Sequence, residues 1–297
     1  MPEKITVCPV CGYDAFTTFL TGKDFFLSGE EFAIIQCKGC GFRITDPLPG
    51  NEEIGRYYDS QDYISHDSGE RNLINLVYKT ARFFTVRSKY RLVKKYSFGQ
   101  RLMDIGCGTG EFLHYCQGKG YICTGIEPNA KARKFAAAKH SLEVGQEIIF
   151  KEEEKGKYDC ITMWHVLEHI HDLNGTLVKL KYALNENGTL ILALPNPDSW
   201  DARFYEKNWA AYDLPRHLYH FSPGQISELA RKHGFHLKKI LPQYLDAFYV
   251  SMLSEKYKRG KKDLVRGFMN GLRSNLKALN RTFGYSSHIY ILSANFP

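Results

Sequence analysis

The chain of 297 residues is 43% hydrophobic and 24% charged, a composition typical of folded soluble proteins that excludes a disordered or fibrous chain. No stretch approaches the roughly 20 apolar residues that cross a bilayer. The N-terminal segment also lacks the order of a secretory signal, so we expect a cytoplasmic protein without a transmembrane segment. The net charge is +8, with the basic excess in residues 79–95 and 255–281. These segments are either solvated helix faces or contacts for an anionic partner, such as a phosphate-bearing molecule, nucleic acid or a membrane surface.

Two Cys-x-x-Cys-Gly units open the chain, one at Cys8 and Cys11 and the other at Cys37 and Cys40. Two thiolates at this spacing hold one metal ion from a single turn, and four satisfy tetrahedral Zn²⁺ with no open position. Chance cysteines or a redox pair are the alternative. We predict a zinc ribbon over residues 1–48 with a structural Zn²⁺. The other cysteines stand in apolar stretches and are expected in the core: Cys107, Cys116, Cys123 and Cys160.

A tyrosine-rich and then basic segment follows over residues 49–96, where we predict a linker and basic helices. The tyrosines cluster in the run Tyr57-Tyr58-Asp59-Ser60-Gln61-Asp62-Tyr63. Tyr63 is kept as a candidate catalytic residue because a phenol can accept or donate a proton.

A glycine-rich loop at residues 106–110 lies between an apolar strand and a helix, in the run Leu102-Met103-Asp104-Ile105-Gly106-Cys107-Gly108-Thr109-Gly110-Glu111. A dinucleotide-binding loop would place its third glycine at position 111, where the carboxylate of Glu111 would repel a pyrophosphate. The next strand, 121–126, ends at Glu127-Pro128, and an acid there accepts hydrogen bonds from both hydroxyls of a ribose. The residues therefore predict a site for an adenosine without a pyrophosphate, with acids near a positive group of the ligand.

These motifs resemble those of class I S-adenosylmethionine (SAM)-dependent methyltransferases, and the resemblance continues through residues 157–169 and 184–195. It implies an α/β fold over 97–297, with a doubly wound, seven-stranded, mostly parallel sheet and SAM beyond the C-terminal strand ends. The third strand is expected near 142–150, and strands at 235–241 and 288–294 form an antiparallel pair at one edge. The resemblance implies the SAM-binding residues Asp104, Gly106, Cys107, Gly108, Gly110, Glu127, Pro128, Trp164 and His165.

A long loop over residues 195–221 follows the predicted fifth strand, and long loops often carry function. It holds His217 and His220 just before a helix that we predict over 222–233, because Ser222-Pro223 is a typical helix start. Histidine is the natural general base near neutral pH. We predict both histidines as catalytic residues, with a structural role as the alternative.

The methyl acceptor is expected to be a small molecule. The turn after the fourth strand reads Trp164-His165-Val166-Leu167, without the Asn/Asp-Pro-Pro-aromatic tetrad of enzymes that methylate amino groups of nucleic acids. The combination of a zinc ribbon, a tyrosine-rich linker, a SAM core and a loop with histidines is similar to that of sugar C-methyltransferases. Those enzymes carry a Glu-His pair where this chain has Arg216-His217 or Tyr219-His220. A sugar or sugar nucleotide of cell-envelope or secondary metabolism is our first expectation, and nucleic acid is not expected as a partner.

Two other enzyme classes stay open. Some quinone-pathway O-methyltransferases resemble residues 165–169 and bind a divalent cation there, although His165 replaces one expected acid. Some ribosomal RNA methyltransferases also join a zinc module to this core. Residues 165–169 match the H-x-x-E-H motif of zinc peptidases too, but that motif needs both imidazoles on one helix face, and these residues straddle a strand end.

An insertion over residues 245–283 separates the last two predicted strands. It contains an apolar stripe at helical spacing, formed by Val265, Phe268, Leu272, Leu276 and Leu279. A second stripe is basic and consists of Lys262, Arg266, Arg273, Lys277 and Arg281. Either the apolar face docks on the core and the basic face is solvated, or these helices cover the acceptor site and offer charge to a phosphate or a membrane surface.

Overall fold

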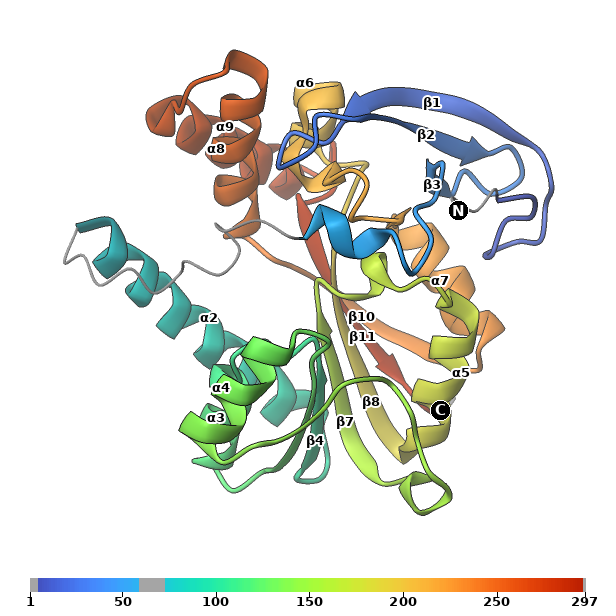
Figure 1. The fold of residues 1–297 in the computed structure, drawn as a ribbon, viewed down its shortest axis with the longest axis vertical. Coiled ribbons are helices and arrows are strands. Elements are labelled where there is room, and N and C mark those ends of the chain that lie inside the picture. The colour runs from blue at the N-terminus through green and yellow to red at the C-terminus, as the bar shows by residue number, and fades with distance from the viewer. Residues whose placement is uncertain (1–4, 59–72, 296–297) are drawn as a thin grey trace.

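The computed structural model describes the backbone of residues 5–58 and 73–295, and the side chains of these residues except 73–83. Within them the strands form two sheets, one with the order β10-β11-β8-β7-β4-β5-β6 and one with the order β1-β2-β3-β9. The larger sheet runs through the centre of the molecule, and the smaller one lies across its upper end in Figure 1.

The larger sheet confirms the predicted fold. Its strands β8, β7, β4, β5 and β6 are parallel, β11 is antiparallel to β8, and β10 is antiparallel to β11. The bounds are β4 (Arg101–Ile105), β5 (Ile122–Ile126), β6 (Glu143–Gly145), β7 (Tyr158–Trp164), β8 (Leu184–Pro195), β10 (His236–Pro242) and β11 (Ser287–Ser293). Only β6 departs clearly from expectation, since it occupies three residues of the range 142–150.

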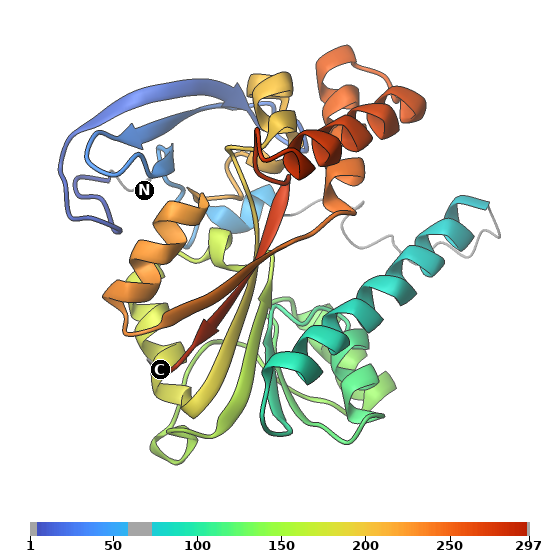
Figure 2. The same ribbon diagram turned by 180° about the vertical axis from the view of Figure 1, so that it is seen from behind.

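Helices cover both faces of this sheet, as Figures 1 and 2 show. One face carries α2 (Leu73–Tyr96), α3 (Glu111–Gln117) and α4 (Ala130–His140), and the other carries α5 (Leu173–Ala183) and α7 (Pro223–Lys232). Because both faces are covered, the central strands are continuously apolar, and residues 190–194 of β8 are all buried. The serine and proline at 222–223 open α7 as predicted.

The short helical segments lie in the connections. They are α6 (Trp200–Tyr205) and the 3₁₀ helices η1 (Ile54–Tyr57), η2 (Glu152–Glu154), η3 (Leu167–His169), η4 (Glu206–Asn208) and η5 (Ala210–Tyr212). Among the described residues, no helix combines the length and apolar character needed to span a membrane.

The smaller sheet joins the N-terminal segment to the loop after β8. Its strands are β1 (Phe16–Lys23), β2 (Glu31–Cys37), β3 (Arg43–Asp46) and β9 (Tyr219–His220). β3 pairs with β9 in antiparallel register, with Arg43 opposite His220 and Ile44 opposite Tyr219. The sheet of the predicted ribbon therefore includes a strand from far beyond residue 48.

Helices α8 (Asp246–Arg259) and α9 (Leu264–Leu279) form the predicted insertion. The buried residues of α9 are small or polar: Gly267, Asn270, Gly271, Ser274, Asn275 and Ala278. Its large apolar residues face outward, so the interpretation that the apolar face docks on the core is wrong. The cause is the close approach of the helices, because a Cβ at Gly267 would lie 2.5 Å from Met252 Cα.

We predict that Gly267→Ala destabilises the protein by about 1–3 kcal/mol, the usual cost of overpacking. In an open helix the same change stabilises, because alanine restricts the unfolded chain. Denaturant unfolding checks the sign. Met269→Ala, on the exposed side of α9, is the matched control and should change the free energy of unfolding by less than about 0.5 kcal/mol. A stabilising Gly267→Ala would contradict the packing.

Candidate active site

The glycine-rich loop between β4 and α3 has an open concave side. Gly106 and Gly108 have φ of +73° and +56°, in the left-handed region that disfavours other residues. A Cβ at Gly106 would lie 2.4 Å from Val166 Cγ2, so this glycine is needed for close packing. A Cβ at Gly108 would meet no heavy atom within 4 Å. A ligand can therefore approach the backbone at Gly108 closely.

Glu127 lies at the end of β5 and is held against this loop. Its Oε2 accepts a hydrogen bond from the backbone N–H of Gly108 at 2.9 Å, and its Oε1 accepts one from Asn129 at 2.8 Å. The backbone carbonyl of Pro128 accepts from Arg133. These bonds fix the carboxylate of Glu127, and each of its oxygens keeps acceptor capacity for a ligand hydroxyl.

Asp104, at the end of β4, is a buried carboxyl. Thr162 Oγ1 donates to its Oδ1 at 2.6 Å. Burial raises the pKa of Asp104 to about 6, although the nearby ammonium of Lys89 opposes the shift. At neutral pH the group is ionised and attracts a cation. The buried thiol of Cys107 beside it has a pKa raised to about 12 by burial, so it stays protonated.

Trp164 is the last residue of β7, the strand that pairs with β4. Its indole N–H is buried and has no hydrogen-bond partner within the described part of the chain. Its ring packs edge-on against Phe112, and the ammonium of Lys89 lies 4.7 Å from the ring centroid. An unpaired buried donor beside an open loop indicates a place for a ligand acceptor.

His165 bridges two acids in the turn after β7. It has a φ of +58°, its Nε2 lies 3.0 Å from Asp246 Oδ2, and its Nδ1 lies 3.5 Å from Glu168 Oε1. Burial disfavours the charged imidazole, but Asp246 and Glu168 outweigh it and raise the pKa of His165 to about 10. His165 is therefore a cation at neutral pH, and it connects β7 to the start of α8.

Glu168, His169 and His217 meet at one point. One ligand atom from each lies within 4.8 Å of the others. Glu168 is 1% exposed, and apart from its ion pair with His165 neither carboxylate oxygen has a hydrogen-bond partner among the residues that the structure describes. Burial alone would raise its pKa, but the three imidazoles hold the pKa of Glu168 below its usual range.

The two imidazoles of this cluster are oriented by backbone carbonyls. His169 Nδ1 donates to the carbonyl of Arg216 at 2.8 Å, and His217 Nδ1 donates to that of Ala211 at 2.8 Å. In the neutral ring the lone pair then lies on Nε2. Two imidazole nitrogens and one carboxylate oxygen form a donor set that divalent transition metals accept, with both rings held from behind as in metal sites.

His220 lies apart from this cluster. Its Nε2 contacts Thr45 Oγ1 at 3.1 Å, and its ring packs edge-on against Tyr212 with centroids 5.3 Å apart. Burial lowers its pKa well below the ordinary value. The structure thus brings His217 to the turn after β7, which carries Glu168, and places His220 against β3. Tyr63 lies outside the described residues.

The loop that carries His217 is fastened to the N-terminal sheet. Thr45 Oγ1 donates to the carbonyl of His217 at 2.6 Å. The guanidinium of Arg216, 4% exposed, contacts Asp24 of the β1–β2 turn at 3.0 Å and Asp213 of its own loop at 2.8 Å. Sequence reasoning missed these partners, since they come from parts of the chain far apart in sequence.

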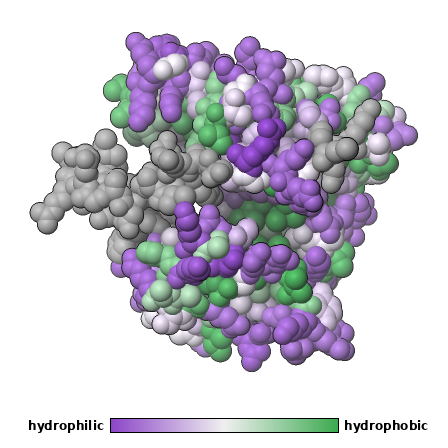
Figure 3. All heavy atoms as spheres, in the orientation of Figure 1, coloured by the Kyte–Doolittle hydropathy of each residue, from purple (hydrophilic) through white to green (hydrophobic). Residues whose placement is uncertain are grey.

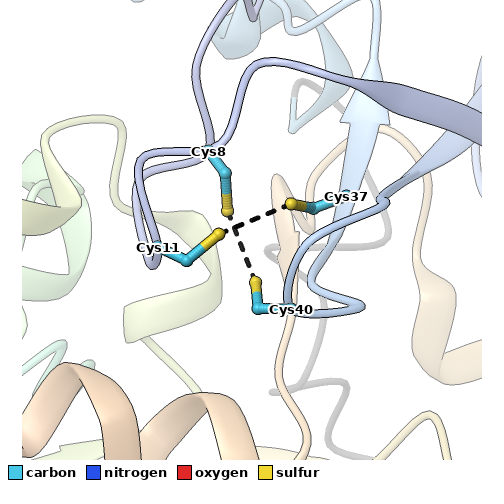
Figure 4. Close-up of side chains that lie close together, drawn as sticks. All are labelled: Cys8, Cys11, Cys37 and Cys40. Atoms are coloured by element: carbon cyan, nitrogen blue, oxygen red, sulfur yellow. Dashed lines mark hydrogen bonds between the residues drawn. The ribbon is translucent and has the colours of Figure 1, made fainter.

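The four N-terminal cysteines converge, as Figure 4 shows. Cys8 Sγ lies 3.6 Å from Cys40 Sγ, Cys11 Sγ lies 3.6 Å from Cys37 Sγ, and all four sulfurs are within 4.8 Å of one another. This donor set fits tetrahedral Zn²⁺. The other four cysteines are buried in the core as predicted.

The surface shows two hollows. Figure 3 shows a hydrophobic hollow near the middle of one face, in the region where the parallel strands of Figure 1 end. A separate cleft of about 470 Å³ lies between β1 and α6, with Phe19, Arg43, Asp198, Arg203 and Lys207 among its lining residues. None of the predicted SAM-binding residues lines this second cleft.

Comparison with known proteins identifies the central domain. The family model described as "Methyltransferase domain" matches residues 78–240. A ubiquinone biosynthesis O-methyltransferase of Nitrosococcus oceani is 28% identical over 177 residues, 55% of this chain and 72% of that protein. One of Dechloromonas aromatica is 23% identical over 189 residues, 59% of this chain and 79% of that protein.

Solved structures support the same fold. A SAM-dependent methyltransferase of Archaeoglobus fulgidus has a TM-score of 0.50 at 22% identity and covers 75% of this chain and 100% of that one. Phosphoethanolamine N-methyltransferase 2 of Haemonchus contortus has a TM-score of 0.53 at 14% identity and covers 95% of this chain and 69% of that one.

Proposed function

Because the chain belongs to the methyltransferase-domain family, we propose that this SAM-dependent methyltransferase methylates a hydroxyl of a small molecule beside a bound divalent cation. The observation that carries the cation is the buried Glu168, whose oxygens lie near two oriented imidazoles and, apart from the ion pair with His165, have no hydrogen-bond partner in the described chain. The contact with His165 is long, at 3.5 Å, so this buried carboxylate keeps lone pairs that a metal cation could take.

The residues around the glycine-rich loop fit SAM. The open side of Gly108 admits the adenosine, and Glu127 offers carboxylate lone pairs to the ribose hydroxyls. Asp104 supplies the charge that attracts the ammonium of the methionine part. The methyl group of the SAM sulfonium is the electrophile, and the chain must hold the acceptor in line with it.

The cluster formed by the turn after β7 and His217 fits a divalent cation. Glu168, His169 and His217 would hold it, and His165 would balance the excess negative charge of Glu168 and Asp246. A cation there would lower the pKa of the acceptor hydroxyl, which would make the hydroxyl oxygen a better nucleophile. We assign His217 to this set rather than to the base, because its Nδ1 is tied to a carbonyl and its ring lies within 4.8 Å of ligand atoms of Glu168 and His169.

The acceptor class follows from this arrangement. Such a cation would help to orient an acceptor with two adjacent oxygens, so we expect a small molecule with vicinal hydroxyls, a class that contains sugars and hydroxylated rings. The relatives named as ubiquinone biosynthesis O-methyltransferases support transfer to oxygen. Transfer to a sugar carbon, or to RNA, is supported by the sequence resemblance alone.

The cysteine cluster completes the proposal with one structural Zn²⁺ per chain, held by Cys8, Cys11, Cys37 and Cys40. A ribbon of this size does not fold without its metal. Because β3 pairs with β9, the metal would also keep the loop of His217 in place.

Methyl transfer to a panel of catechols and sugar nucleotides, with Mn²⁺ or Co²⁺ or with EDTA, tests the function. We expect O-methylated products, identified by NMR, that depend on the added cation. Glu168→Gln should lower kcat by about 10²–10⁴-fold, the scale for losing the activation of the nucleophile, and leave the SAM affinity unchanged. C-methylated products, or full activity in EDTA, would overturn the proposal.

We predict that the SAM affinity falls as the pH drops through about 6. The carboxyl of Asp104 is ionised above this pH and protonated below it, and only the ionised form attracts the ammonium. Asp104→Asn should weaken SAM binding at pH 7.5 by about 1.5–3 kcal/mol, the value of a charged hydrogen bond, and remove the pH dependence. Calorimetry checks both. Glu127→Gln, the control, should weaken binding and keep the pH dependence.

We predict one zinc per chain in protein purified without chelator. Cys8→Ser should lose the metal and lower kcat, since β9 and the loop of His217 contact β3. The variant should keep its SAM affinity, because the proposed SAM-binding residues lie at strand ends of the other sheet. Metal analysis and calorimetry measure the two effects. Cys123→Ser, in the core, should keep its zinc. Zinc-free wild-type protein would contradict the assignment.

A further inference from the structure

Helix α9 exposes a continuous apolar face. Val265 is 77% exposed and Phe268 is 51% exposed. The face consists of Leu264, Val265, Phe268, Met269, Leu272, Leu276 and Leu279. Single exposed apolar residues are ordinary, but a contiguous apolar face on one helix marks a contact surface.

Buried hydrogen bonds fix this orientation. Asn270 Nδ2 donates to Glu255 Oε1 at 2.9 Å, Ser274 Oγ donates to Asp201 Oδ1 at 2.7 Å, and Asn275 Nδ2 donates to the carbonyl of Tyr244 at 3.0 Å. Turning the apolar face inward would break all three and leave the acids of α6 and α8 without these partners. The apolar face therefore stays outward in the folded protein.

Basic residues border the apolar face. Arg266, Arg273 and Lys277 are exposed along one side of α9. The segment 255–281 contains nine basic residues and two acids. Both acids are engaged within the segment, since Glu255 pairs with Arg259 and Asp263 caps the start of α9. The surface is therefore positive as well as apolar.

We propose that α9 is a membrane-contact helix that lies on an anionic lipid surface, with its apolar face among the acyl chains and its basic side at the phosphates. An amphipathic helix with Phe and Leu on one face and Lys and Arg beside them binds in this way. Charge complementarity selects this occupant. A second copy would bring two sets of basic residues into one interface. The helices stand at one corner of the molecule, as Figures 1 and 2 show, so a flat surface can reach them.

Vesicle co-sedimentation tests this inference without any methyl acceptor, so it stands or falls separately from the proposed function. The probes are vesicles of phosphatidylcholine alone and vesicles with phosphatidylglycerol. The wild type should bind the anionic vesicles at low salt, bind the neutral ones far less, and dissociate as salt rises. Arg273→Gln with Lys277→Gln should weaken binding about 30-fold, and Phe268→Ser with Leu272→Ser should weaken it at least as much.

Phe98→Ser with Ile149→Ser is the matched control, because both residues are exposed elsewhere on the molecule, and it should bind like the wild type. Thermal unfolding should show that all variants are folded. The proposal is overturned if the wild type does not bind anionic vesicles at low salt, or if the control weakens binding as much as the α9 variants. It is also overturned if sedimentation velocity shows a dimer that Phe268→Ser with Leu272→Ser dissociates.

Discussion

The charge of Arg216 is buried where three parts of the chain meet, and a buried guanidinium is stable only when acids and carbonyls surround it. Asp24 comes from the N-terminal sheet, Asp213 from the loop after β8, and the carbonyl of Tyr57 from η1. Asp213 and Asp24 raise the pKa of Arg216 against the effect of burial. Because His217 is the next residue, the same contacts set the position of its imidazole relative to Glu168.

The candidate site itself follows from the parallel sheet. The ends of β4, β5 and β7 bring Asp104, Glu127 and His165 to one edge, which any sheet of this topology does. The N-terminal sheet adds what the core lacks, a rigid support for the loop that supplies His217. Asp246 ties the insertion to the same edge through His165. Both added segments therefore act on the turn after β7. The N-terminal sheet supports the loop of His217, and the insertion contacts His165 through Asp246.

Much of this could be predicted from the sequence. The cysteine spacing and the glycine-rich loop are local patterns whose chemistry allows few arrangements, and both lie where we expected them. The strand β6 occupies only three residues of the range 142–150 where it was expected, because the weak alternation of apolar and polar residues in that range gives no sharp bounds. The pairing of β3 with β9 could not be predicted, since a two-residue strand leaves no periodic pattern.

The orientation of α9 shows a second limit of sequence reasoning. Periodicity reveals that a helix has an apolar face, but it does not say which face the protein covers. Here the covered face consists of glycines and small polar residues, which a hydropathy pattern assigns to solvent. The cluster of Glu168, His169 and His217 was only partly visible, because His217 joins the other two through tertiary structure alone.

The pairing of β3 with β9 also constrains the order in which the chain can fold during synthesis. β1, β2 and β3 leave the ribosome before β9, so β3 has this partner only when residues 219–220 emerge. Until then β3 is an open sheet edge, able to pair with other chains. Its short length of four residues and the charge of Arg43 limit that hazard. The first sheet is thus completed only by a strand from the second half of the protein.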